Sequence, residues 1–321
     1  MTQTALIADI GGTNTRLALA QGPELDASSI KRFRNADHAN FEAVVSAYLP
    51  QVGAPVISGA CVAAAGPVVD GVAELTNIDW TLDIPTIARA AGCAEVALLN
   101  DLQAPGHAVG RIAPEGLLPV ITTATPLSPE ATRLVVNVGT GFNAVPVHST
   151  ATGRFVPPSE SGHVNLPIRT EADLRLSHYV DDSHGFPAVE EVLSGRGLEN
   201  VYRWHCAETG AAPELRGSEI IAAAEAGQSP QAVAAVQTFL RFLGTVSGNL
   251  ALEHLPFGGV YLVGGVAVGL AGLLNGGAFA EGFRDKGRFG GFMEDFPVTL
   301  VRDDHAPLIG CASHLHERRT G

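Results

Sequence analysis

The sequence predicts an α/β protein in which two related halves carry mixed sheets and bind a ligand between them. The segments ALIADIGGTNTRLALA and RLVVNVGTGFNAVPV both read as an apolar strand, a turn of small residues and a second apolar strand. Their separation of about 130 residues is far longer than the period of a solenoid, so the repeat indicates two related domains. Elsewhere apolar runs alternate with stretches of helical periodicity, as expected for hairpins followed by crossover helices.

Local patterns predict the individual elements. Apolar runs predict strands at 56–65 and 96–99. The helical spacing of apolar residues predicts helices at 84–91, 190–203, 218–226 and 230–253. Ser229 and Pro230 form a cap and first-turn pair at the start of the last of these helices.

The composition is that of a globular protein, with 46% apolar and 17% charged residues. A net charge of −13 argues against a nucleic-acid partner, which needs a basic face to neutralise phosphates. The four cysteines include no Cys-x-x-Cys pair, so we expect free thiols in a reducing compartment rather than a zinc site. The first residues lack the basic and apolar regions of a signal peptide, and we expect a cytoplasmic protein.

The uncharged segment 256–280 is long enough to be considered as a membrane span. It contains many glycines and a proline, and it divides at Gly264 and Gly265. We therefore expect a strand, a glycine turn and a helix here, and no membrane partner.

The residues Gly11, Gly12, Thr13 and Asn14 form a predicted hairpin tip, shortly after the strand residue Asp9. Small residues let the backbone approach a ligand, and the N–H and hydroxyl groups of such a turn can donate to phosphate oxygens. Asp9 is a candidate to hold Mg²⁺ through water. Taken alone, the segment is equally typical of an ordinary tight hairpin, and it lacks the Gly-Lys-Ser/Thr of a Walker loop.

Two further glycine turns follow predicted strands. Gly139, Thr140 and Gly141 form the corresponding turn of the second hairpin, so the two turns together could hold one polyphosphate from two sides. Gly264 and Gly265 could pack against a flat base or ribose, where a larger side chain would collide.

Asn100 and Asp101 end an aliphatic strand and place a carboxylate at the mouth of the expected binding site. Phosphoryl transfer to a hydroxyl needs a group that accepts the hydroxyl proton, and Asp101 suits that role. The pair Asn-Asp is also common as a helix cap or an Asx turn, which is the simpler interpretation of these two residues alone.

Glu160 and His163 lie across a turn of small residues and could hydrogen-bond neighbouring hydroxyls of a polyol, although a surface loop pair would look the same. Glu190 lies just before a predicted helix turn, where an acidic side chain can also interact favourably with the helix dipole. Spacing does not choose between Glu190 and Glu191.

Over nearly its whole length the chain resembles the bacterial glucokinase family of the actin–hexokinase superfamily. The resemblance rests on several motifs in order, which together are far more specific than any one of them: DIGGTNTRLAL, LTNIDW, LLNDL, VGTG, ESGH, VEEVLSGRGL and YLVGG. It implies two actin-like (ribonuclease H-like) domains with mixed sheets flanking a central cleft. The small domain would comprise 1–105 and 298–321, and the large domain would comprise 106–297.

The resemblance also implies roles for the candidate residues. Gly11 to Asn14 match the first phosphate motif, Gly139 to Gly141 match the second, and Gly264 and Gly265 match the adenosine motif. The glucose-binding positions, with Asp101 as the base, are matched by Asn100, Asp101, Glu160, His163 and Glu190. The family's glutamate stands three residues before the leucine of VEEVLSG, which selects Glu190 over Glu191.

Two positions depart from the family pattern. The second phosphate turn usually continues Gly-Leu-Gly, whereas here it reads Gly141, Phe142, Asn143, and the usual Glu-Gly-Gly-His has Ser161 as its second residue. Asparagine tolerates left-handed φ better than most residues, so we expect Asn143 to hold the same turn with modest strain. Any effect of these changes is expected on nucleotide affinity rather than on sugar binding.

We therefore expect an ATP-dependent hexokinase that uses Mg²⁺ and has glucose as its acceptor. A kinase for another hexose or an amino sugar is an alternative of the same class. A non-catalytic sugar-binding regulator is an alternative of a different class, which Phe142 and Asn143 favour and Asp101 disfavours because a regulator needs no base. The expected partners are a hexose and ATP, and a homodimer is left open.

Overall fold

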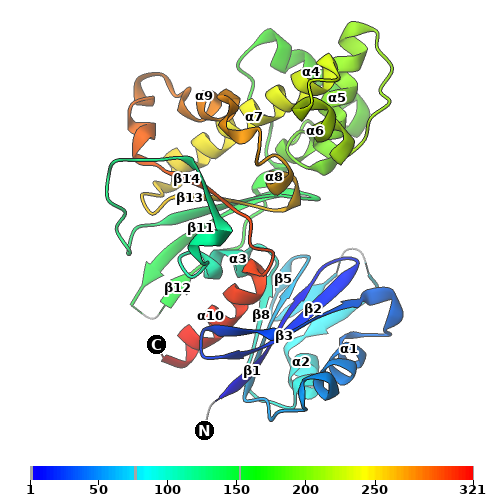
Figure 1. Cartoon of the computed structure of the whole chain (residues 1–321), viewed down its shortest axis with the longest axis vertical. Helices are drawn as coiled ribbons and strands as arrows, with labels where there is room; N and C mark the ends of the chain where they lie inside the picture. Colours follow the sequence, from blue (N-terminus) through cyan, green and yellow to red (C-terminus); the bar gives the residue numbers. More distant parts are fainter. Residues whose placement is uncertain (1–2, 76–77, 152, 321) are drawn as a thin grey trace. The chain divides into compact units, whose positions relative to one another are not determined.

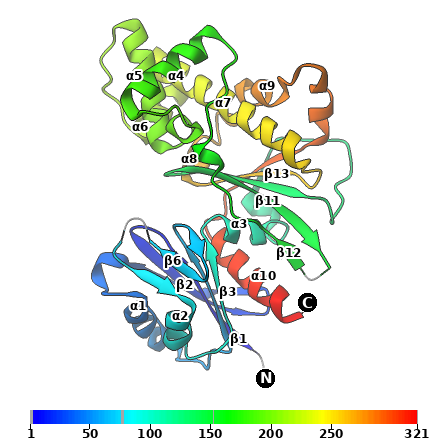
Figure 2. The ribbon, with the colours of Figure 1, turned by 180° about the vertical axis from the view of Figure 1, so that it is seen from behind.

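A computed structural model of the chain describes residues 3–75, 78–151 and 153–320, so the motif LTNIDW lies partly outside the described residues. The chain divides into two compact units (Figures 1 and 2). The first unit comprises Met1–Pro114, Val147–Pro158 and Asp303–Gly321, and the second comprises Glu115–Pro146 and Ser159–Arg302.

The first sheet has the strand order β3-β2-β1-β4-β8. Its central strand β1 pairs antiparallel with β2 and parallel with β4, and β4 pairs parallel with β8. The strands are β1 (Thr4–Ile10), β2 (Asn14–Gln21), β3 (Glu24–Arg34), β4 (Gly59–Ala64) and β8 (Val96–Asn100). A small antiparallel sheet consists of β5 (Val68–Val69), β6 (Val72–Glu74) and β7 (Thr81–Asp83).

Both faces of the first sheet are buried, and β1 is apolar from Ala5 to Ala8 and at Ile10. Successive side chains of a strand point to opposite faces. Leu6, Ala8 and Ile10 accordingly pack in a core with α1 (Phe41–Tyr48) and α2 (Ile84–Ala91). Ala5 and Ile7 pack in a second core with α3 (Gln103–Ala108) and α10 (Ala306–Thr320). A strand covered by helices on both sides is typically apolar at successive residues, as β1 is from Ala5 to Ala8.

The second sheet has the strand order β12-β11-β10-β13-β14-β9. Its strands are β9 (Leu117–Ile121), β10 (Arg133–Val138), β11 (Phe142–Thr150), β12 (Gly153–Phe155), β13 (Val260–Val263) and β14 (Val298–Val301). The helices of this part of the chain are α4 (Glu171–His184), α5 (Gly195–Thr209), α6 (Ser218–Glu225), α7 (Pro230–His254), α8 (Gly265–Gly269) and α9 (Ala278–Arg284).

The two sheets repeat one topology. In each, a hairpin and a third strand lie on one side of the first strand (β1-β2-β3 and β10-β11-β12). On the other side two parallel strands follow, β4 and β8 in the first sheet and β13 and β14 in the second. The structure therefore confirms the mixed α/β class, and it shows that the weak sequence repeat marks the start of two sheets with the same strand order.

Most predicted elements are present. The predicted strand 96–99 is β8, and the predicted helices 84–91, 218–226 and 230–253 are α2, α6 and α7. The Ser229 side chain accepts a hydrogen bond from the Ala232 N–H, which confirms the predicted cap. The segment 256–280 contains β13, the turn at Gly264 and α8, as expected. The predicted strand 56–65 is shorter, because β4 begins at Gly59, beyond the exposed Val56.

The predicted helix 190–203 begins at the wrong residue. Val189–Glu191 forms a short 3₁₀ turn, and α5 begins only at Gly195. Ser194 caps it, since its hydroxyl accepts a hydrogen bond from the N–H of Gly197. At the end of the second sheet, β14 pairs parallel with β13 and antiparallel with β9.

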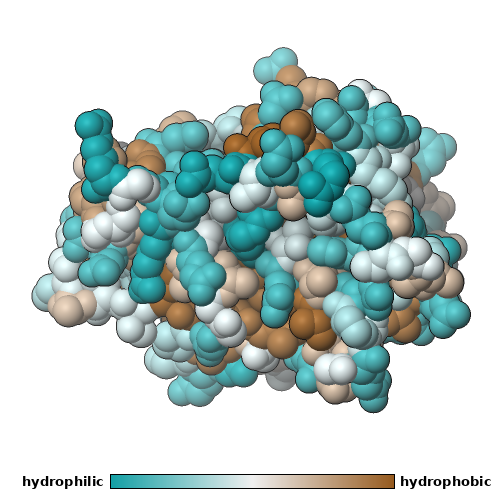
Figure 3. Space-filling model, turned by 90° about the horizontal axis from the view of Figure 1, so that it is seen from above, coloured by the Kyte–Doolittle hydropathy of each residue, from teal (hydrophilic) through white to brown (hydrophobic). Residues whose placement is uncertain are grey.

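The surface is mostly polar. The face drawn in Figure 3 is largely hydrophilic or neutral, with hydrophobic residues in small separate groups. Within the described ranges, no helix combines the length and the apolar character that crossing a membrane requires.

Two histidines of the first unit are packed against each other in the interior. The rings of His107 in α3 and His314 in α10 have their centroids 4.3 Å apart. Burial lowers the pKa of His107 to about 3, and the charges of His314 and Arg154 act in the same direction. Burial also lowers the pKa of His314 to about 4, helped by Arg318 and opposed by Glu317. Both rings are therefore neutral in the folded protein near neutral pH.

We predict that the free energy of unfolding falls as the pH is lowered from 6.5, the ordinary histidine pKa, to about 4. In this window the unfolded chain takes up protons that the folded rings do not, so acid favours the unfolded state. Urea denaturation at about pH 7, 6 and 5 measures the slope. His107→Leu should flatten it, whereas His178→Gln, at an exposed position of α4, should not. Equal slopes in wild type and His107→Leu would contradict this account.

Candidate functional site

The carboxyl edge of the first sheet brings two of the predicted motifs together. Ile10, Ala64 and Asn100 are in register on the parallel strands β1, β4 and β8. The N–H of Asp101 donates to the Ala64 carbonyl at 3.0 Å. Parallel strands carry ligand-binding groups at this edge. The first glycine turn and Asp101 thus follow strand ends at the same edge of one sheet.

A buried asparagine, Asn35, supports the first glycine turn. The Gly11 N–H donates to the Asn14 carbonyl at 3.0 Å across the turn. Asn35 donates from its Nδ2 to the Gly11 carbonyl at 2.7 Å and from its backbone to the Thr13 carbonyl at 2.9 Å. Its Oδ1 accepts from the Thr15 hydroxyl at 2.8 Å. Asn35 therefore holds both strands of the hairpin tip in place.

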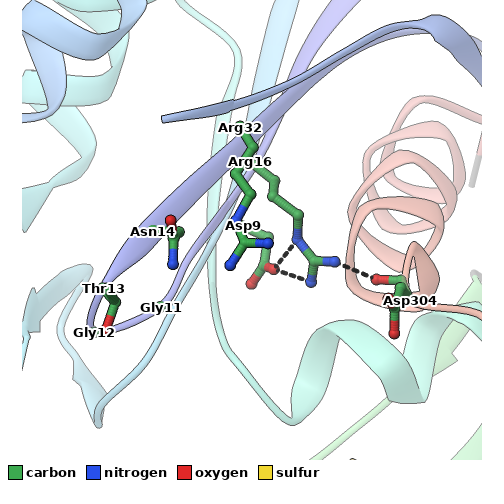
Figure 4. A pocket seen from close by; sticks show the side chains of 8 residues that line it. All are labelled: Asp9, Gly11, Gly12, Thr13, Asn14, Arg16, Arg32 and Asp304. Atoms are coloured by element: carbon green, nitrogen blue, oxygen red, sulfur yellow. Dashed lines mark hydrogen bonds and ion pairs between the residues drawn. The ribbon is translucent and has the colours of Figure 1, made fainter. Parts of the chain in front are cut away.

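An arginine is fixed beside this turn. Asp9 and Arg16 are cross-strand partners in the hairpin, and Oδ2 of Asp9 accepts from Nη2 of Arg16 at 2.6 Å and from its Nε at 3.1 Å. Nη1 of Arg16 donates to the Asp304 backbone carbonyl at 2.6 Å. Figure 4 shows Asp9, Arg16, Arg32 and Asp304 around a pocket of about 370 Å³ that the glycine turn also lines. The pocket thus combines backbone donors with guanidinium groups, which suits an anion.

Asp9 was predicted to hold Mg²⁺ through water. Its side chain is 14% exposed, with one oxygen already occupied by Arg16. The described residues contain no cluster of three acidic, histidine or cysteine side chains. Mg²⁺ is usually held by one or two carboxylates together with waters and substrate phosphates. Asp9 therefore fits only an ion that takes its other ligands from water and from a bound anion.

Asn100 has a structural role that sequence reasoning gave as the simpler interpretation. Its Oδ1 accepts from the Leu102 N–H at 2.9 Å, which is an Asx turn, and its Nδ2 donates to the Gly66 carbonyl at 2.7 Å. This half-buried side chain thereby fixes the backbone of Asp101, which lies exposed at the strand end.

The second glycine turn is held by a carboxylate. The Gly139 N–H donates to the Gly141 carbonyl at 2.9 Å between β10 and β11. Oε2 of Glu190 accepts from the Phe142 N–H at 2.8 Å. Glu191 has other partners, because its Oε1 lies 2.6 Å from Nη2 of Arg196. Of the two glutamates that spacing left open, Glu190 is therefore the one placed at the turn.

A pocket of about 730 Å³ surrounds the second turn. It is lined by Gly139, Thr140, Gly141, Glu190, Gly195, Arg196, Glu199, Gly217, Gly265 and Val266. The N-terminus of α5 opens into this pocket, and the positive end of a helix dipole favours a negatively charged ligand. At Gly265 the space that a side chain would occupy is open. Gly264 follows β13 with a φ of +101°, and the space that its side chain would occupy is filled by the Val138 carbonyl.

Glu160 and His163 lie together on the surface of the second unit. Glu160 precedes a short 3₁₀ turn, Ser161–His163, and His163 is the last residue of that turn. Nε2 of His163 lies 3.9 Å from Oε2 of Glu160, and both side chains are about two-thirds exposed, at 64% and 67%. The two residues are thus close partners, as the sequence predicted.

The expected strain at Asn143 is wrong. Among described residues other than glycine, positive φ occurs at Ala54, Asp70 and Leu255, and Asn143 is an ordinary residue of β11. Its side chain points to the loop before His163, since Oδ1 accepts from the Ser161 N–H at 3.0 Å.

Sequence reasoning missed the residues that support the turns. Arg16 stands inside the motif DIGGTNTRLAL, and its position opposite Asp9 in a two-stranded hairpin could have been inferred from the turn length. Asn35 carries no local signal, because the Gly11 carbonyl that it contacts is 24 residues away in the chain. Arg196 was missed although its partner Glu191 is only five residues away. The structure gathers Asp9, the first turn, Asn100 and Asp101 in one unit, and the second turn, Glu160, His163, Glu190, Gly264 and Gly265 in the other.

The fold is a mixed α/β architecture of three sheets, and each of the two glycine turns lines a pocket. The Glucokinase family model matches residues 6–318. The chain is 33% identical over 320 residues to a glucokinase of Klebsiella pneumoniae subsp. pneumoniae, covering 99% of this chain and 98% of that protein. It is 33% identical over 310 residues to a glucokinase of Brucella abortus biovar 1, covering 96% and 90%.

The fold agrees with these relatives. A crystal structure of glucokinase from an Antarctic psychrotroph superimposes with a TM-score of 0.87 at 31% identity, covering 98% of this chain and 99% of that one. The chain therefore belongs to the Glucokinase family, as its motifs indicated.

We predict that Gly141→Ala destabilises the second unit while Gly139→Ala does not. A Cβ at residue 141 would lie 2.5 Å from Oε2 of Glu190, so the carboxylate would have to leave the Phe142 N–H. Losing such a charge-assisted hydrogen bond costs about 1.5–3 kcal/mol. A Cβ at residue 139 would find its nearest atom at 3.7 Å, so the control should change stability by less than about 0.5 kcal/mol. Equal losses in urea denaturation would contradict the role given to Glu190.

Proposed function

We propose that this protein transfers the γ-phosphate of ATP to the 6-hydroxyl of glucose and releases glucose 6-phosphate and ADP. The observation that carries the proposal is the placement of Asp101 at the same sheet edge as the first glycine turn, in a chain that matches the Glucokinase family from residue 6 to 318. A base and a phosphate-binding turn on one edge are the parts that phosphoryl transfer to a hydroxyl requires.

The nucleotide would use the glycine turns. We assign the phosphates to the backbone donors of Gly11 to Asn14 and of Gly139 to Gly141, and the adenosine to Gly264 and Gly265. The open face of Gly265 in the larger pocket supports the adenosine assignment, because a flat base needs a surface without side chains. The N-terminus of α5 in the same pocket supports the assignment of a phosphate there.

The sugar would use five residues from the two units. We propose that Asn100, Asp101, Glu160, His163 and Glu190 hydrogen-bond its hydroxyl groups. Glu190 accepts from the Phe142 N–H through Oε2, and its Oε1, which lies 3.7 Å from Nη2 of Arg196, would meet the sugar. Asn100 would contribute the second hydrogen of its amide, since the first is donated to the Gly66 carbonyl.

In the reaction, the 6-oxygen of glucose forms a bond to the γ-phosphorus as the bond to the bridging β,γ-oxygen breaks. Asp101 accepts the hydroxyl proton, and ADP leaves with the bridging oxygen. Backbone N–H groups of the two turns and the guanidinium of Arg16 stabilise the charge on the phosphoryl oxygens. Mg²⁺, when bound beside Asp9 through water, would neutralise part of the triphosphate charge.

We further propose that 1–105 with 298–321 and 106–297 form the two predicted domains, and that bound sugar is shielded from water. The availability of ATP and the four free cysteines fit a cytoplasmic location.

The regulator alternative loses the feature that favoured it. Phe142 and Asn143 favour a regulator only if they lower nucleotide affinity by altering the turn, yet Asn143 has an ordinary strand conformation and the turn is closed by the Gly139–Gly141 hydrogen bond. Another hexose or an amino sugar remains an alternative acceptor. The enzyme is therefore the better account.

We predict ADP release with glucose at a higher kcat/KM than with mannose, fructose or glucosamine, measured in a coupled assay. Titration of Mg-ATP into the glucose-saturated protein, followed by calorimetry, should give a clear binding signal. A flat Mg-ATP titration beside a clear glucose signal would overturn the kinase and leave a sugar-binding regulator. A preference for another sugar would keep the kinase and correct the acceptor.

We predict that Asp101→Asn retains glucose binding and loses most of the turnover. Asparagine keeps the size and hydrogen bonding of the side chain but is no base, and general-base catalysis typically contributes about 10²–10⁴-fold. Calorimetry gives the glucose Kd and the coupled assay gives kcat. The control Asp37→Asn changes an exposed carboxylate of the same unit and should leave both unchanged. An Asp101→Asn variant with more than about a tenth of the wild-type kcat would remove Asp101 from the role of base.

A further inference from the structure

The two residues at which this chain departs from the family pattern contact each other. Asn143 replaces the last glycine of the usual Gly-Leu-Gly, and Ser161 replaces the first glycine of the usual Glu-Gly-Gly-His. Oδ1 of Asn143 accepts from the Ser161 N–H at 3.0 Å and from its hydroxyl at 3.1 Å. The residues are 18 positions apart in the chain, so their pairing is a tertiary contact of the second unit.

The Asn143 amide connects a strand to a loop. Oδ1 also accepts from the Ala144 N–H at 2.8 Å, which keeps the side chain directed along β11. Nδ2 donates to the Ser159 carbonyl. The half-buried amide therefore holds the backbone on both sides of Glu160, the residue between its two partners. Glycine at position 143 has no side chain with which to make any of these bonds.

The neighbouring residue of β11 makes the matching contact on the other side. The Phe142 N–H donates to Oε2 of Glu190 at 2.8 Å. Two adjacent residues that follow the second glycine turn thus hold two elements that carry proposed sugar ligands. Phe142 holds Glu190, and Asn143 holds the Glu160–His163 loop.

We propose that Asn143 and Ser161 are a matched pair of positioning residues that sets the Glu160–His163 loop for hexose binding. The inference rests on the proposed function for the identity of the ligand. Asn143 touches neither phosphate nor sugar in this account; it acts through Glu160 and His163. Loss of the Asn143 side chain should therefore weaken sugar binding and leave nucleotide binding unchanged. This is the opposite of the effect that its place beside the phosphate turn indicated.

The test compares Asn143→Gly, Ser161→Gly and the double variant with wild type. Asn143→Gly should raise the glucose KM roughly tenfold, because it removes several hydrogen bonds that order the loop. The KM for ATP should change less than about twofold, since the turn keeps its own hydrogen bond. Ser161→Gly should have a smaller effect, and the double variant should be no worse than Asn143→Gly, because Ser161 loses its side-chain partner in either case.

Two further variants separate positioning from general destabilisation. Asn143→Asp retains the acceptor oxygen and loses the donor to Ser159, so its glucose KM should fall between those of wild type and Asn143→Gly. Ser149→Gly introduces the same flexibility elsewhere in β11 and should leave both KM values unchanged. The glucose Kd from calorimetry should follow the glucose KM throughout.

A higher ATP KM with an unchanged glucose KM in Asn143→Gly would overturn the inference while leaving the kinase in place. Additive effects in the double variant would overturn the matched pair. If the wild type bound glucose without phosphorylating it, the proposed function would fail, yet the glucose Kd values would still decide whether Asn143 positions the loop. A wild type that does not bind glucose would overturn both.

Discussion

The hydrogen bond from the Phe142 N–H to the Glu190 carboxylate is the contact on which the second half of the site depends. It joins the strand after the glycine turn to the 3₁₀ turn before α5, and therefore fixes the turn, Glu190 and the N-terminus of that helix with respect to one another. Gly141 leaves the space that the carboxylate fills. Because the same carboxylate is a proposed sugar ligand, one hydrogen bond fixes both the proposed phosphate turn and a proposed sugar ligand in this unit.

The first half of the site follows from a different constraint, the direction of parallel strands. β1, β4 and β8 end in register, so a glycine turn, a tight connection and the Asn100–Asp101 pair come together at one edge of the sheet. The repeated topology places the second glycine turn after the equivalent strand β10, beside the parallel strands β13 and β14. The strand order that buries two apolar faces of a sheet therefore also places the candidate site residues together at the carboxyl ends of the strands.

The sequence predicted what depends on local pattern. Both hairpins, α2, α6, α7 and the strand ending at Asn100 are encoded by apolar periodicity, turn residues and caps within each segment. It failed where an outcome depends on residues distant in the chain. The start of α5 was misplaced because Ser194 is a cap inside an otherwise helical pattern, and the bracing of the first turn by Asn35 has no signature in its own neighbourhood. The strain expected at Asn143 was wrong for the same reason, since its conformation is decided by Ser159 and Ser161 rather than by the turn that precedes it.

A protein with a net charge of −13 has to bind a polyanion against its own average field. The structure resolves this locally. Backbone N–H groups at glycine turns and at a helix N-terminus carry partial positive charge, and they attract phosphate without changing the net charge. The arginines near the turns are held by carboxylates, Arg16 by Asp9 and Arg196 by Glu191, so each guanidinium is oriented before the ligand arrives. In such a pair the carboxylate charge offsets part of the attraction between the arginine and an anion. The arginine is already ordered, however, so binding an anion does not carry the entropy cost of ordering a long side chain. The acidic residues around the pockets are therefore part of the anion-binding arrangement, and removing Asp9 or Glu191 would weaken the orientation of an arginine even as it makes the pocket more positive.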